Sequence, residues 1–184
     1  MNTSMDITRE TGLRETRLGI DRLIGDLASS EGMQRQRARK RLVDIGRLAT
    51  PPLVETLQST SKHARWEAAK ALGAIQDPGA APALVGALRD QESSVRWLAA
   101  KGLIGLGRDA LIPLLESLEK ESDSVWMREG AHRVLHALVE EDVANDAAPV
   151  LEALEDIEPA IEVPIAAFNL LQVLRRQAEE SPIG

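Results

Sequence analysis

Apolar residues of two sizes recur along the chain at a fixed interval. Four alanines lie 31 residues apart and a fifth follows after 36, at Ala38, Ala69, Ala100, Ala131 and Ala167. A leucine follows each alanine after three or four residues, at Leu42, Leu72, Leu103, Leu135 and Leu171. Because this spacing places side chains on one helical face, the pattern predicts an amphipathic helix that is repeated five times.

A second leucine column indicates a second helix in each repeat. It comprises Leu27, Leu57, Leu88, Leu118 and Leu154, and prolines that suit the first turn of a helix precede four of them. Turn residues such as Asp77, Pro78 and Gly79 separate the two helices. We therefore expect helices over 13–29, 33–47, 51–59, 62–76, 80–90, 94–107, 109–120, 124–141, 146–156 and 160–178.

Tandem pairs of helices predict an all-α fold, an α-solenoid in which each pair stacks on the next. The columns define about four to five helix pairs over 13–178, between disordered ends at 1–12 and 179–184. The first and last helices each represent half a pair, as caps do. The alanine is expected at the closest approach of neighbouring helices, where only a small side chain fits.

The composition agrees with this fold and limits the kinds of site and the cellular location that we expect. Aromatic residues make up only 2% of the chain, so the core must be aliphatic. The lack of cysteine excludes disulfides and thiolate metal sites. No signal peptide and no run of about 18 apolar residues is found, so we expect a soluble, cytoplasmic protein without membrane contact.

The charge is distributed unevenly along the chain. The net charge is −7, of which residues 1–50 contribute +3 and residues 51–184 contribute −10. Residues 140–162 hold nine carboxylates and no Lys or Arg. In a repeat fold, this gradient along the sequence becomes a gradient in space.

The repeat resembles those of HEAT repeat proteins, specifically the short HEAT-like repeats of the phycobiliprotein (bilin) lyases. The motif includes Val95-Arg96, Ala99-Ala100 and Leu103, and again Leu72-Gly73 followed by Asp77-Pro78. The resemblance covers about residues 13–176, with degraded first and fourth units and a longer loop at 140–146. It implies an armadillo-like superhelix in which the second helices line the concave face.

The polar positions of the second helices are therefore the candidate binding surface. Two positions beside the second leucine column predict a carboxylate ladder interrupted by one arginine: Glu55, Arg89, Glu116, Glu119, Glu152 and Glu155. A solvated helix face would give the same pattern. As a function, the ladder favours a basic peptide or a basic protein surface as the partner, with charge steering the association.

Three tryptophans form a second candidate surface. Trp66 and Trp97 occupy equivalent positions one repeat apart, each after an arginine, and Trp126 lies near the matching position of the next repeat. One interpretation is packing at the rim between repeats. The other is an exposed hot spot for a partner, because Trp and Arg are enriched in such sites.

No catalytic or metal-binding constellation is evident, so neither a cofactor nor a metal is predicted. His132 and His136 share a helix face but lack the Glu of a zinc-protease motif. HEAT-like di-iron hydroxylases use His-Glu dipeptides, which this chain lacks. HEAT-like DNA glycosylases need a basic groove, whereas this one is predicted to be acidic.

The segment 35–41, RQRARKR, is basic, in contrast to the predicted acidic ladder. Nucleic-acid binding is one interpretation, but the charges are scattered around the helix and no aromatic residue is interleaved to stack on bases. Contact with the acidic end of another copy is a second interpretation, which predicts a monomer with weak, salt-sensitive self-association.

The leading hypothesis is thus a non-enzymatic scaffold or adaptor that binds a protein or peptide along the concave face. The alternative is a subunit of a bilin lyase or a similar modifying complex. Nucleic-acid binding through 35–41 ranks third.

Overall fold

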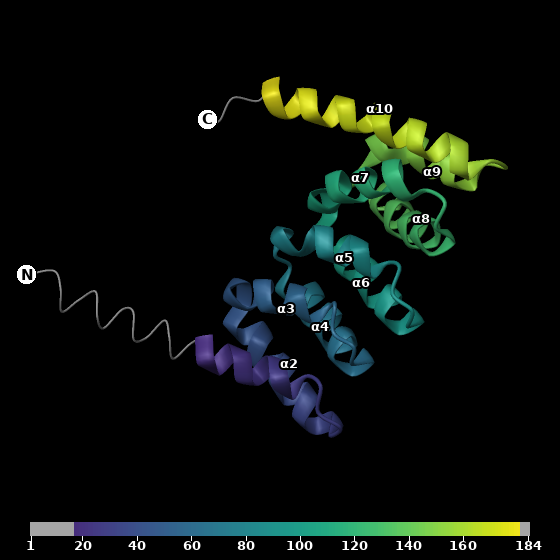
Figure 1. Ribbon diagram of the computed structural model, residues 1–184. Coiled ribbons are helices and arrows are strands. Elements are labelled where there is room, and N and C mark those ends of the chain that lie inside the picture. Colours follow the sequence, from purple (N-terminus) through teal and green to yellow (C-terminus); the bar gives the residue numbers. More distant parts are fainter. Residues whose placement is uncertain (1–16, 181–184) are drawn as a thin grey trace, which may run out of the picture. The chain divides into compact units, whose positions relative to one another are not determined.

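The computed structural model describes residues 17–180, and every regular element within them is a helix (Figure 1). The chain divides into two compact units between Ile75 and Gln76. Of the predicted disordered ends, residues 1–12 and 181–184 lie outside the described residues, whereas Glu179 and Glu180 belong to the last helix.

The first unit contains a helix over 17–26, then α2 (Gly32–Ile45), a 3-10 turn (Gly46–Ala49), α3 (Thr50–Thr56) and α4 (Lys62–Ile75). Helix α4 packs against both α2 and α3. Ala38, Leu42, Ala69 and Leu72 are buried, as the columns predict.

The second unit begins with a 3-10 turn (Pro78–Ala80), α5 (Ala81–Ala87) and α6 (Ser93–Leu106). A second turn (Gly107–Ala110) leads to α7 (Leu111–Glu121) and α8 (Val125–Glu140). A third turn (Asn145–Ala147) precedes α9 (Ala148–Glu155) and α10 (Pro159–Glu180). Each helix lies where the pattern predicts it, with its ends displaced by a few residues.

One arginine near the start of each first helix ties down the linker before it. Arg35 Nη1 donates to the carbonyl oxygens of Ser29 at 2.8 Å and Ser30 at 3.1 Å. Arg96 Nη1 makes the equivalent bond to Asp90 O, also at 2.8 Å. Arg65 and Arg128 repeat the contact with the linkers before their own helices. The arginine of the family motif is therefore a structural residue that satisfies carbonyl groups between helices.

A residue with a positive φ angle follows each of the helices α2, α4 and α6. Gly46 and Gly107 follow α2 and α6 with φ angles of 73° and 60°. Glycine adopts these angles readily because it has no Cβ atom to clash with the backbone. Gln76 takes the equivalent position after α4 with φ of 53°. Its side chain donates to Gly105 O at 3.4 Å.

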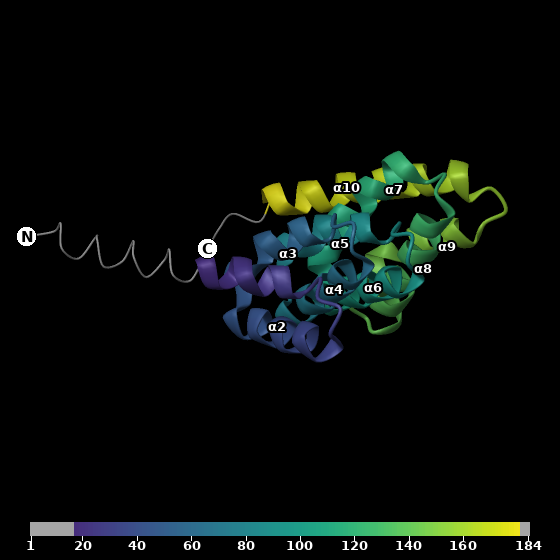
Figure 2. The ribbon, with the colours of Figure 1, turned by 60° about the horizontal axis from the view of Figure 1, so that its bottom comes forward.

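The last helix departs from the repeat. Like the first helices, α10 buries its alanine and leucine, Ala167 and Leu171. A continued repeat would set it beside α8, just as α6 packs against α8. Instead α10 lies along α7 and α9, as both views show (Figures 1 and 2). The longer loop after α8, where the interval grows from 31 to 36 residues, accompanies this change of neighbour.

The alanine column can be tested at Ala100, which is 1% exposed. We expect Ala100→Leu to lower the free energy of unfolding by about 1–3 kcal/mol, because the larger side chain overpacks the contact. Chemical denaturation measures this change. Ala74→Leu adds the same atoms at an exposed position of α4 and should be nearly neutral. Equal stability of Ala100→Leu and the parent chain would refute the steric role.

Candidate functional site

The six residues of the predicted carboxylate ladder lie on second helices or at their ends, but they do not form one row of free charges. Glu55 is exposed on α3 of the first unit, and the other five belong to the second unit. There, Glu119 is half-buried on α7, whereas Glu152 and Glu155 are exposed on α9.

Ion pairs inside the second unit occupy three of these residues. Glu116 Oε1 accepts from Arg175 Nη2 of α10 at 2.9 Å. Glu155 Oε1 lies 2.9 Å from His132 Nε2 of α8, and Arg89 pairs with Glu121. Arg175 therefore neutralises Glu116, Glu155 is engaged by His132, and Glu119 and Glu152 are the members without such a contact in this part of the described chain.

A cleft of about 580 Å³ lies between α9 and α10. Its apolar lining comes mainly from α10, with Ile165, Leu170 and Val173. Ile165 and Val173 remain 54% and 46% exposed, so they are available to a binding partner. Of the predicted ladder, this cleft contains Glu152 alone. The sequence pattern missed the cleft because α10 was expected to stack as another first helix.

Four carboxylates surround this apolar lining: Asp146, Glu152, Asp156 and Glu162. Asp146 is held by Arg108, whose Nη2 and Nη1 donate to Oδ2 and Oδ1 at 2.8 and 3.1 Å. These hydrogen bonds lower the pKa of Asp146 and raise the pKa of Arg108. The other three carboxylates form no ion pair within residues 17–180. The cleft thus combines an apolar surface with three free negative charges.

The tryptophans differ in exposure, and each lies beside a cation. Trp97 and Trp126 are 51% and 42% exposed, whereas Trp66 is half-buried. Within the second unit, Arg96 Cζ lies 4.6 Å from the ring centroid of Trp126, and Lys101 Nζ lies 5.4 Å from that of Trp97. In the first unit, Lys70 Nζ lies 4.6 Å from Trp66. The rings therefore take part in cation–π contacts, and two of them remain accessible for a partner.

The two clustered histidines are each joined to a carboxylate. Their ring centroids lie 5.9 Å apart. His132 contacts Glu155, and His136 Nδ1 lies 3.5 Å from Glu140 Oε2. Within the described residues, no group of three or more His, Asp or Glu side chains is arranged to hold a metal ion.

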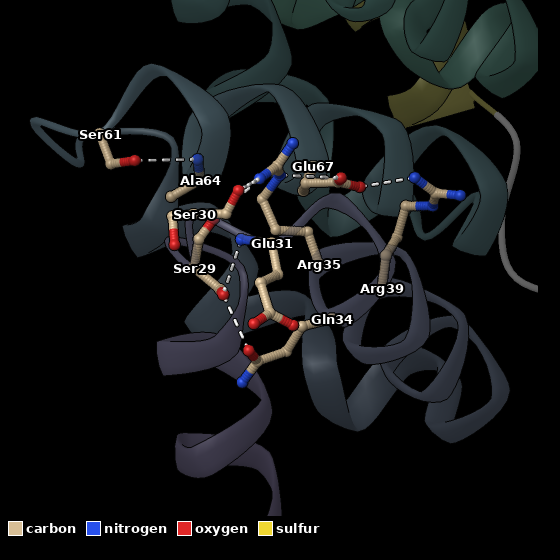
Figure 3. A network of polar contacts seen from close by, with 9 residues as sticks. All are labelled: Ser29, Ser30, Glu31, Gln34, Arg35, Arg39, Ser61, Ala64 and Glu67. Atoms are coloured by element: carbon tan, nitrogen blue, oxygen red, sulfur yellow. Dashed lines mark hydrogen bonds and ion pairs between the residues drawn. The ribbon is translucent and has the colours of Figure 1, made fainter.

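The basic segment 35–41 divides its charges between two sides of α2. Arg39 Nη1 donates to Glu67 Oε2 at 2.5 Å, and Arg35 Nε lies 3.7 Å from Glu67 Oε1 (Figure 3). Glu67 is the buried carboxylate of α4 and is 4% exposed. The remaining cations, Arg37, Lys40 and Arg41, are exposed. One side of the segment therefore joins α2 to α4, and on the other side Arg37 and Arg41 line a cleft with Leu23 and Asp26.

The fold places the chain among all-α repeat proteins of the α-solenoid class. Residues 20–103 match the family of HEAT repeats, which confirms the resemblance seen in the alanine and leucine columns. The matched segment therefore consists of HEAT-like repeats. No curated protein matches it.

Solved structures give the same class. The complex of CpcE and CpcF of phycocyanin lyase from Nostoc sp. PCC7120 is similar with 28% identity and a TM-score of 0.55, over 83% of this chain and 98% of that chain. An engineered protein has 22% identity over 86% of this chain and 80% of its own, with a TM-score of 0.41. A designed armadillo repeat protein in complex with the peptide (KR)4 has 21% identity over 81% and 80%, with a TM-score of 0.41.

In residues 17–180, none of the helices combines the length and the apolar character needed to cross a bilayer.

The ion pair of Arg108 with Asp146 should make stability depend on pH. Because the folded-state pKa of Asp146 is lowered, the stabilisation is present above about pH 4 and is lost as the pH falls through the lowered pKa. We expect Asp146→Asn to cost about 0.5 kcal/mol at neutral pH, the usual size for an exposed pair. In denaturant titrations this difference should shrink towards about pH 3. A difference that is constant with pH would exclude the charge as its cause.

Proposed function

We propose that the chain is a non-enzymatic, cytoplasmic interaction module that binds a basic segment of a protein partner. The binding surface is the cleft between α9 and α10, to which the predicted ladder contributes Glu152. Glu119 of α7 is also unpaired and stays a candidate contact outside the cleft, whereas Glu116 and Glu155 would have to exchange their present partners. Glu55, on the first unit, stays a candidate contact of its own.

The observation that carries this proposal is the composition of the cleft. Ile165 and Val173 offer exposed apolar surface beside Glu152, Asp156 and Glu162. An amphipathic basic helix would bury its apolar side chains there and place its cations near the carboxylates. The charges would raise the association rate and select against acidic partners.

The solved relative supports a role in assembly. It is a complex of two chains, CpcE and CpcF, and the likeness covers nearly all of the matched chain. Repeats of this type stack on their neighbours and create extended surfaces for partners. The fold is thus compatible with a HEAT-repeat scaffold that binds partners. The acidic cleft favours a basic segment as the ligand.

A labelled helical peptide of Lys and Leu provides a direct test by fluorescence anisotropy. We expect it to bind the full chain, and Glu152→Lys and Glu162→Lys each to weaken binding roughly fivefold, about 1 kcal/mol. Glu129→Lys makes the same charge change at an exposed position of α8 and serves as the matched control. No binding of this peptide, or equal weakening by all three substitutions, would refute the proposed site.

A second candidate function is favoured by the same relative. The chain would then be one subunit of a bilin lyase or a similar modifying complex, and would act with a second subunit. Coexpression with a tetrapyrrole-producing pathway tests this idea. A coloured chain that retains the pigment through purification would support a role as a lyase subunit. A colourless chain from pigment-containing cells would contradict that role.

A further inference from the structure

A basic face of α2 remains exposed, although Met33, Arg37 and Arg41 also line a cleft of about 340 Å³ with Leu23, Asp26 and Glu31. Met33, Arg37, Lys40 and Arg41 follow one another at intervals that place them on one side of the helix. All four side chains are exposed, and Met33 is 62% exposed. Within residues 17–180, the three cations form no ion pair.

The rest of α2 holds this face in place. Arg35 and Arg39 point to the other side, where Glu67 of α4 binds both (Figure 3). Arg35 also bonds to the linker carbonyls of Ser29 and Ser30. Because these two arginines are already engaged, α2 presents its free cations on a helix that is fixed before any partner arrives. Little conformational entropy of the helix would be lost on binding.

The face of α2 and the cleft of the second unit are complementary in both charge and polarity. The cleft has three carboxylates without ion-pair partners in the described part of the chain, Glu152, Asp156 and Glu162, beside exposed apolar side chains of α10. The α2 face has three free cations and the apolar Met33. Other arginines of the second unit, such as Arg108 and Arg175, are already bound to carboxylates.

We propose that the α2 face of one copy binds in the cleft between α9 and α10 of a second copy. This inference rests on the proposed function, since it names the basic segment that the same cleft accepts. The two contacting surfaces differ, so the association is heterologous. In the resulting dimer one copy still has a free cleft and the other still has a free α2 face, so assembly can continue beyond a dimer.

The contact should be weak and sensitive to salt. The contact consists of one helix face and one cleft, whereas stable protein interfaces bury roughly 1,200–2,000 Å² and involve about 20–30 residues on each side. Charge attraction at an exposed contact is screened by salt, since the Debye length falls to about 8 Å at physiological ionic strength. Self-association should therefore appear at high protein concentration and low ionic strength.

Sedimentation velocity of the full chain over a range of concentrations tests the proposal. At low ionic strength, we expect the average mass to rise with concentration beyond that of a dimer, and to return to that of a monomer at high salt. Two charge-reversed variants, Glu152→Lys/Glu162→Lys and Arg37→Glu/Arg41→Glu, should each weaken association roughly tenfold or more, because like charges then face one another. All four residues are exposed, and circular dichroism should report the same helicity for both variants.

Mixing the two variants gives the decisive result. The variant with a basic cleft and the variant with an acidic α2 face should associate with each other, because the mixture restores opposite charges at both contacts. A wild-type chain that stays monomeric, or a mixture that fails to associate, would overturn the inference. If the Lys and Leu peptide still binds in that case, the proposed function stands and only the identity of the occupant is wrong.

Discussion

The close approach of helices at the alanine column is the constraint on which the rest of the structure depends. Ala38, Ala69, Ala100, Ala131 and Ala167 are all buried. Side chains of this size let neighbouring helices approach to the lower end of the usual 8–10 Å range. Gly130 shows how tight the second unit is, since a Cβ atom there would lie 2.9 Å from Leu88 Cδ2. Leucine columns and linker-binding arginines complete each repeat around this contact.

The proposed binding surface depends on the packing of α10. Because α10 packs along α7 and α9, it brings Arg175 to Glu116 and forms a cleft with α9. Helix α10 also exposes Ile161, Ile165 and Phe168. The change in packing thus explains why exposed apolar residues and free carboxylates occur together. The proposed binding therefore depends on the altered packing of α10 rather than on the regular repeat.

Most of the fold could be predicted because it depends on local periodicity. Ala100 and Leu103 identify a buried helix face from spacing alone, and Gly107 identifies the end of that helix. The site was less predictable because its residues meet through tertiary packing. Glu116 belonged to the expected ladder, but nothing in its own repeat indicates that Arg175 of α10 would neutralise it. Glu152 was identified correctly as exposed, yet its neighbours in the cleft depend on the altered position of α10.

If the packing of α10 creates the binding site, a bound peptide should protect the helices that line the cleft, and hydrogen exchange of the full chain measures this. Backbone amides should be compared with and without saturating Lys and Leu peptide. We expect slower exchange in α9 and in the first half of α10, with α6 and α8 unchanged. Protection confined to α6 and α8, or to the first unit, or no protection at all, would show that the cleft is not the binding site.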